Sequence, residues 1–190
     1  QLQFIADNAV SRGGDIVFAT AVGDVWQHPI IEIDPDHAAR GFRPRPALAG
    51  AGVAAWADGV RNVEIPASVA AYDRIDGVLP FSVVSGNHDY DGQWWDEQWP
   101  QDLTAPPGDL RRLGMIHIGG LTAFTQAFGA TSKYFKDRPW YVASHDDGAD
   151  SAQVFEAGGY RFLHIGLQFD PPNDTLAWAA SVIEANKGLP

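Results

Sequence analysis

Two short apolar runs constrain the fold of this chain more than any other feature. Residues 15–22 (DIVFATAV) and 80–85 (PFSVVS) are rich in apolar and β-branched side chains, the pattern of strands buried in a parallel sheet. Each run ends at a glycine followed by a polar residue, Asp24 after the first and Asn87 after the second. The sequence therefore predicts two buried strands that deliver polar side chains at their carboxyl ends, where ligands collect in open α/β sheets.

Helical segments are predicted around and between these strands. Apolar residues recur at helical spacing near the start of the chain and stop at Gly13-Gly14, and Pro66 is typical of a first helical turn. Asn173 or Asp174 is the predicted cap of a closing helix. The predicted helices cover residues 2–12, 67–75, 121–128 and 175–186.

Three further strand-like runs lie near the end of the chain, at residues 140–144, 153–156 and 160–168. Gly158-Gly159 separates the last two runs and predicts a tight antiparallel hairpin. Helices that alternate with strands place the chain in the α/β class with both parallel and antiparallel pairing.

Length and composition limit the function classes. The 190 residues predict one domain over residues 1–190, with the Pro-broken stretch 29–62 as an insertion or loop excursion. A formal net charge of -11 argues against nucleic acid as a partner, because such binding needs clustered Lys and Arg. With no cysteine, any metal must be held by Asp, Asn, His or Glu, and no apolar run has the length of a membrane span.

The residues after the two strands have side chains suited to metal-assisted chemistry. A carboxylate such as that of Asp24 can bridge two divalent ions, and the amide oxygen of Asn87 can complete one coordination shell. The imidazole of His88 can donate a proton to a leaving alkoxide. Together these side chains predict a metal-dependent site at the ends of the two strands.

The segments Gly23-Asp24 and Gly86-Asn87-His88-Asp89 resemble the strand-end signatures of the calcineurin-like metallophosphoesterases. The resemblance implies a layered α/β/β/α-like fold with central mixed sheets and a phosphomonoester or phosphodiester as substrate. It also implies two divalent metal ions (Mn, Fe or Zn) and attack by a metal-bound hydroxide. In that family Asp24 would be the ligand shared by both metals and Asn87 a ligand of one. His88 would contact the phosphate or protonate the leaving oxygen, and Asp89 would orient His88.

The chain also departs from the family pattern. The family begins with an Asp-x-His strand end and closes with strand-end histidines, and neither motif stands in this sequence. The resemblance is therefore to the central part of the family's domain. We expect the domain in this chain to be incomplete at both ends. Whether this chain alone is active is left open by the sequence.

Other residues are weaker candidates. Among the remaining histidines, His28 is the best placed to approach the site, because it follows Asp24 by four residues, whereas a histidine within a strand is more often structural. The run from His145 to Asp150 has the side chains of a small cation site but lacks the length and closing Glu of a calcium loop, and it indicates a solvated hairpin or loop. Arginines and tryptophans near the two signatures suit phosphate recognition or stacking, but a solvated loop and ordinary core packing explain them as well. The further candidates are His117, His145, His164, Arg40, Arg43, Arg45, Arg61, Trp94, Trp95 and Trp99.

Two other functions compete with the enzyme. The chain is alternatively a non-catalytic protein that keeps the scaffold for binding, or an unrelated α/β protein in which the signature is fortuitous. The sequence leaves open the substrate, the metal identity, the oligomeric state and the compartment, including a secreted or periplasmic one.

Overall fold

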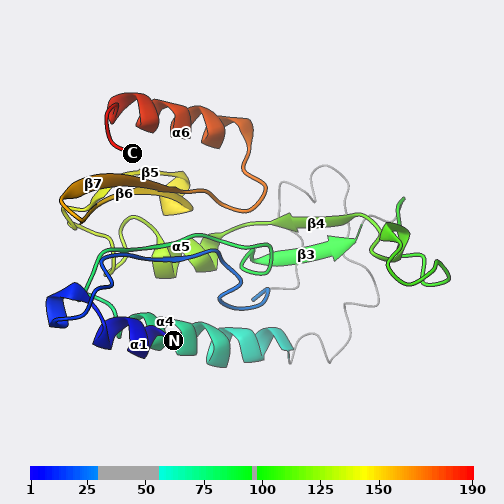
Figure 1. Cartoon of the computed structure of the whole chain (residues 1–190). Helices are drawn as coiled ribbons and strands as arrows, with labels where there is room; N and C mark the ends of the chain where they lie inside the picture. Colours follow the sequence, from blue (N-terminus) through cyan, green and yellow to red (C-terminus); the bar gives the residue numbers. More distant parts are fainter. Residues whose placement is uncertain (30–55, 96–97) are drawn as a thin grey trace.

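The structure is a computed structural model and describes residues 1–29, 56–95 and 98–190. Residues 30–55, most of the predicted excursion at 29–62, lie outside the described residues. The described chain contains helices together with parallel and antiparallel sheets, which is compatible with the predicted α/β class (Figure 1).

The two apolar runs form neighbouring parallel strands. β1 (Ala19–Ala21) pairs with β2 (Phe81–Val83), with Ala19 opposite Phe81 and Ala21 opposite Val83. Each strand has three residues, which is shorter than the predicted runs, and β2 is buried throughout. Because the strands are parallel and in register, their carboxyl ends leave the sheet at the same edge.

The elements stack in four layers (Figure 1). An antiparallel sheet of β5 (Tyr141–His145), β6 (Asp150–Ala157) and β7 (Tyr160–Gly166) is covered on one side by α6 (Asn173–Ala185). Its other side faces β1 and β2, beyond which lie α1 (Leu2–Asp7) and α4 (Ile65–Tyr72). The ring of Phe18 stacks on that of Phe155 with centroids 4.3 Å apart, so aromatic packing joins the two sheets.

The core lies between the parallel sheet and the helices on its far side. Its centre is a set of almost fully buried rings whose members contact one another at centroid separations of 5.2–6.3 Å. α5 (Thr122–Phe128) contributes two of these rings and β2 contributes one. The central rings are Phe81, Phe124, Phe128, Tyr134 and Phe135.

The predicted helices are present with altered ends. α1 stops at Asp7 and a 3₁₀ turn follows, because Ala9 forms a parallel bridge with Ile16 and thereby leaves the helix. α4 follows a π-helical segment, η3 (Val60–Glu64), and residues 56–59 are also helical. α6 begins at Asn173 after Pro172, so Asn173 lies inside the helix and the predicted cap is wrong. No helix in the described residues combines the length and apolarity needed to cross a membrane.

The predicted hairpin is confirmed. β6 and β7 pair antiparallel through seven residue pairs, and Ala157 lies opposite Tyr160 across the turn. Gly158 and Gly159 have φ values of 57° and 82°, a left-handed conformation that glycine adopts without steric cost.

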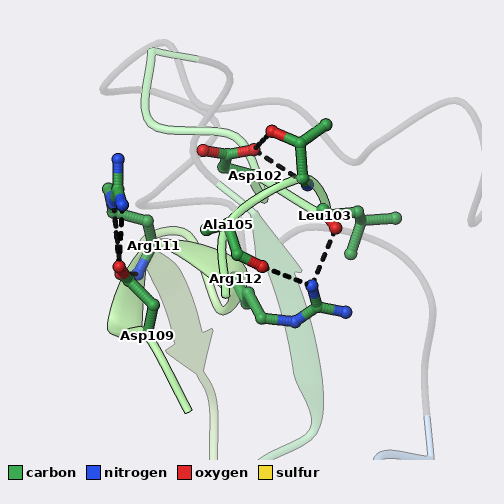
Figure 2. A network of polar contacts seen from close by, with 7 residues as sticks. Asp102, Leu103, Ala105, Asp109, Arg111 and Arg112 are labelled. Carbon is green, nitrogen blue, oxygen red and sulfur yellow. Dashed lines mark hydrogen bonds and ion pairs between the residues drawn. The ribbon is translucent and has the colours of Figure 1, made fainter. Parts of the chain in front are cut away.

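A second hairpin was missed by the sequence analysis. β3 (Gly92–Trp95) pairs antiparallel with β4 (Ile116–Gly119). The segment between them is braced by polar contacts (Figure 2): the Arg112 guanidinium donates to the carbonyls of Leu103 and Ala105, each at 2.7 Å. Asp109 pairs with Arg111 and accepts its backbone N–H. Local polar contacts, rather than an apolar pattern, order this segment.

Acidification should destabilise the protein through His164 on β7. Burial lowers the pKa of His164 below its ordinary 6.5, so the folded state prefers the neutral ring. The unfolded state then binds the proton first, and the free energy of unfolding falls as pH drops through that range. Urea unfolding at about pH 7.5 and about pH 5.5 should show a smaller loss in His164→Gln than in the wild type. An equal loss in both proteins would contradict this assignment.

Candidate functional site

The two strand-end signatures meet at one edge of the parallel sheet. The backbone N–H of His88 donates to Oδ1 of Asp24 at 3.2 Å, across 64 positions of sequence. Asn87 lies in the same turn, between Gly86 and His88, and is half-buried. Asp24 has a φ of 56°, an uncommon conformation for a residue other than glycine and one that Asp tolerates. The structure therefore brings together the residues that the sequence predicted to share a site.

Two glycines permit this close approach. A Cβ on Gly23 would lie 1.9 Å from the backbone nitrogen of Gly86, and one on Gly86 would lie 2.2 Å from Oδ1 of Asp24. Gly23 also has a φ of 94°. Neither loop has room for a side chain at these positions, so the glycines are needed for the geometry of the site.

Gly86→Ala should therefore destabilise the protein, by about 2 kcal/mol or more, because Asp24 or the backbone must move. Gly59 provides a matched control, because its φ is -60° and a Cβ there meets nothing within 4 Å. Gly59→Ala should be neutral or stabilising by about 0.5–1 kcal/mol, as expected for alanine in a helix. Thermal unfolding measures both changes, and a neutral Gly86→Ala would contradict the close approach.

Asp89 joins the two loops through its buried carboxylate. The side chain is fully buried, and its two oxygens accept four backbone N–H groups. Burial raises the pKa of Asp89, whereas the four donors favour the charged form. The donors are Asp24 (2.6 Å), Val25 (2.8 Å), Trp26 (3.2 Å) and Gly86 (2.7 Å).

The predicted role of Asp89 needs correction. Its hydrogen bonds go to backbone amides, whereas Nδ1 of His88 lies 2.7 Å from Oε1 of Gln27. Gln27 is held in turn, because its backbone N–H donates to Oε2 of Glu64 at 3.0 Å. Gln27, which the sequence analysis missed, is the side chain that orients His88, and Asp89 fixes the loops around it.

His28 lies beside His88, as its spacing from Asp24 predicted. The two rings are nearly parallel, with centroids 5.6 Å apart and an interplanar angle of 24°. Nδ1 of His28 lies 2.8 Å from the carbonyl oxygen of Tyr90, to which it donates. The ring of His28 also contacts the indole of Trp56, with ring centroids 6.4 Å apart.

The other histidine candidates lie elsewhere or are structural. His164 packs on Phe18, and its Nδ1 lies 3.1 Å from Oε1 of Gln153. His145 contacts the fully buried Asp150 at 3.2 Å. Asp150 is not in a solvated turn, as the sequence indicated, because it is the first residue of β6 and binds the loop before α6. The side chain of His117 lies outside the described part of the structure.

Among the arginine and tryptophan candidates, Arg61 lies near the site, Trp99 lies away from it, and the others, or their side chains, lie outside the described part of the structure. Arg61 donates to the carbonyl of Pro29 and pairs with Asp58, so it contacts the loop that carries His28. Trp99 is 62% exposed and lines a groove of about 700 Å³ in the segment between β3 and β4. The remaining candidates are outside the described residues or have side chains outside them: Arg40, Arg43, Arg45, Trp94 and Trp95.

The donor chemistry of the strand ends suits part of a metal site. Asp24 is exposed and Asn87 half-buried at the same sheet edge, and both offer the oxygen atoms that divalent cations prefer. Across residues 1–29, 56–95 and 98–190, no group of three or more His, Asp or Glu side chains is placed to hold a metal ion. The described site thus offers two candidate ligands, with His88 and its partner Gln27 beside them.

No protein-family model, curated protein or solved structure matches the chain in comparisons with known proteins.

Proposed function

We propose that the protein is a metal-dependent phosphoesterase of the calcineurin-like kind, which hydrolyses a phosphomonoester or phosphodiester. The observation that carries the proposal is the contact between the two strand-end signatures. His88 N–H binds the Asp24 carboxylate, and Asp89 ties both loops together through four backbone amides. The layering of α6, two sheets and the α1–α4 helices supports the same proposal.

Asp24 and Asn87 would hold divalent cations through their side-chain oxygens. Such cations, when bound, neutralise phosphate charge and lower the pKa of a coordinated water. The two side chains would thereby hold the cations, and with them the phosphate of the substrate, at the edge where β1 and β2 end.

His88 would move a proton to the leaving oxygen. Its Nδ1 lies against the side-chain amide oxygen Oε1 of Gln27, which can only accept, so Nδ1 carries a hydrogen. Nε2 would carry the proton that goes to the leaving oxygen, so the donating ring has a hydrogen on both nitrogens. Gln27 is neutral, and it therefore orients the ring without adding a charge. The contact from Glu64 to the Gln27 backbone keeps this partner in place.

Hydrolysis of p-nitrophenyl phosphate and bis(p-nitrophenyl) phosphate tests the proposal, with Mn²⁺, Fe²⁺ or Zn²⁺ added to metal-free protein. We expect turnover with at least one ester that depends on added metal and is abolished by a chelator. Binding of the cations at the strand ends without turnover of either ester would contradict the enzyme and favour a non-catalytic scaffold.

A further inference from the structure

Three aromatic rings from separate segments form a row that starts at His88. His28 lies nearly parallel to His88 at 5.6 Å, and Trp56 meets His28 at 6.4 Å with an interplanar angle of 61°. His28 is buried, with 3% of its surface exposed, whereas Trp56 is 41% exposed. The row therefore begins at the proposed proton donor and ends at an indole that is open to solvent.

The exposed indole of Trp56 belongs to a helical segment that is hydrogen-bonded to the loop after Asp24. Along this segment, Arg61 donates to the carbonyl of Pro29, Glu64 accepts the backbone N–H of Gln27, and Ser68 donates to the carbonyl of Val25. These contacts join three successive turns of helix to the loop that follows Asp24. Trp56 thus has a fixed place relative to His88, as a contact for a ligand requires.

We propose that Trp56 stacks against a planar aromatic ring on the alcohol part of the phosphate ester, which is the substrate class of this site. The inference rests on the proposed function. Centroid separations of 5.6 Å and 6.4 Å place the rings of His88 and Trp56 no more than about 12 Å apart. His88 and Trp56 each contact His28, so an ester that reaches both carries its ring on a spacer that spans at most about this distance from the phosphate, as in a nucleoside monophosphate.

Charge and chemistry support a small aromatic ester as the ligand. The net charge of -11 disfavours a nucleic acid polymer, whose binding grows with the number of phosphates neutralised. A mononucleotide presents a single phosphate, and a cation bound at the site can offset that charge locally despite the acidic net charge of the protein. An exposed indole provides a stacking surface that accepts any planar base.

NMR titration of the ¹⁵N-labelled protein in buffer with Zn²⁺ tests the inference. The probes are adenosine 5′-monophosphate and ribose 5-phosphate, each as its hydrolysis-resistant phosphonate analogue, which share the sugar phosphate group and differ in the base. Both should shift the backbone amide signals of Asp24 and His88. The nucleotide alone should shift the indole N–H signal of Trp56, identified by its loss in Trp56→Phe.

Affinities provide the second readout. The nucleotide should bind about tenfold more tightly than ribose 5-phosphate, and Trp56→Leu should remove this advantage while leaving the affinity for ribose 5-phosphate unchanged. Trp99→Leu is the matched control, because Trp99 is also exposed but lies in the segment between β3 and β4, and it should keep the advantage.

The possible failures are distinguishable. Equal affinity for the two probes, with shifts at Asp24 and His88 but none at Trp56, would overturn the stacking inference and leave the phosphoesterase proposal standing. No shift at Asp24 or His88 with either probe would contradict both.

Discussion

Asp89→Ala should lower the free energy of unfolding by about 3–5 kcal/mol, because four backbone N–H groups lose their acceptor at once. A buried donor left without a partner costs about 1–3 kcal/mol, and water entering the new cavity recovers part of the total. The cost is expected even though burial raises the pKa of Asp89, because the loops are built around its oxygens. Urea unfolding measures the change.

One further variant and one control show whether the loss of stability comes from the acceptor oxygens of Asp89 or from the volume of its side chain. Asp89→Asn keeps the volume but turns an NH₂ group toward backbone donors, so it should also destabilise the protein clearly. Asp102→Ala should change stability little, because the Asp102 carboxylate accepts from local donors, the backbone N–H and the hydroxyl of Thr104. An unfolding midpoint for Asp89→Ala equal to that of the wild type would show that Asp89 does not hold the site together.

Asp24→Asn and Asn87→Ala should reduce metal-dependent phosphoester hydrolysis to background, since each removes a candidate metal ligand. Asparagine is the better replacement for Asp24, because the backbone there has a φ of 56°, which asparagine tolerates and alanine does not. The substitution thereby separates loss of the carboxylate from backbone strain. Initial rates across a range of metal concentrations measure the effect.

His88→Ala should behave differently. It removes the proposed proton donor and should slow turnover by about 10²–10⁴-fold while sparing most metal binding. Gln27→Leu should give a smaller loss of kcat and a changed pH profile, because His88 loses its oriented partner but keeps its ring. Rates near those of the wild type in Asp24→Asn, Asn87→Ala and His88→Ala would contradict the assignment of the site.

The strand pair was predictable because its pattern is local. Continuous apolar runs that end in Gly-Asp and Gly-Asn gave β1, β2 and the shared sheet edge. Gly158-Gly159 specified a hairpin in the same way, since the turn conformation needs glycine. In both cases, residues that are adjacent in sequence carry the whole signal.

The remaining features depend on contacts between distant residues. β3 (GQWW) lacks an alternation of polar and apolar residues and β4 (IHIG) alternates over only four positions, and the intervening segment contains polar contacts such as those of Arg112. Gln27 and Trp56 carry no motif, and their roles emerge only when helix and loop are placed together. The role of Asp89 was misjudged because sequence proximity to His88 does not reveal which groups its buried oxygens accept.

Paramagnetic broadening by Mn²⁺ tests most directly whether the strand ends bind metal. At low Mn²⁺ concentration the backbone amide signals of Asp24 and His88 should broaden first in the ¹⁵N spectrum, and Asp24→Asn should abolish the effect. Asp137→Asn should leave it intact, because Asp137 is an exposed aspartate with a similar φ of 60° outside the site. Broadening spread over the acidic surface and unchanged in Asp24→Asn would contradict the metal site and the phosphoesterase proposal with it.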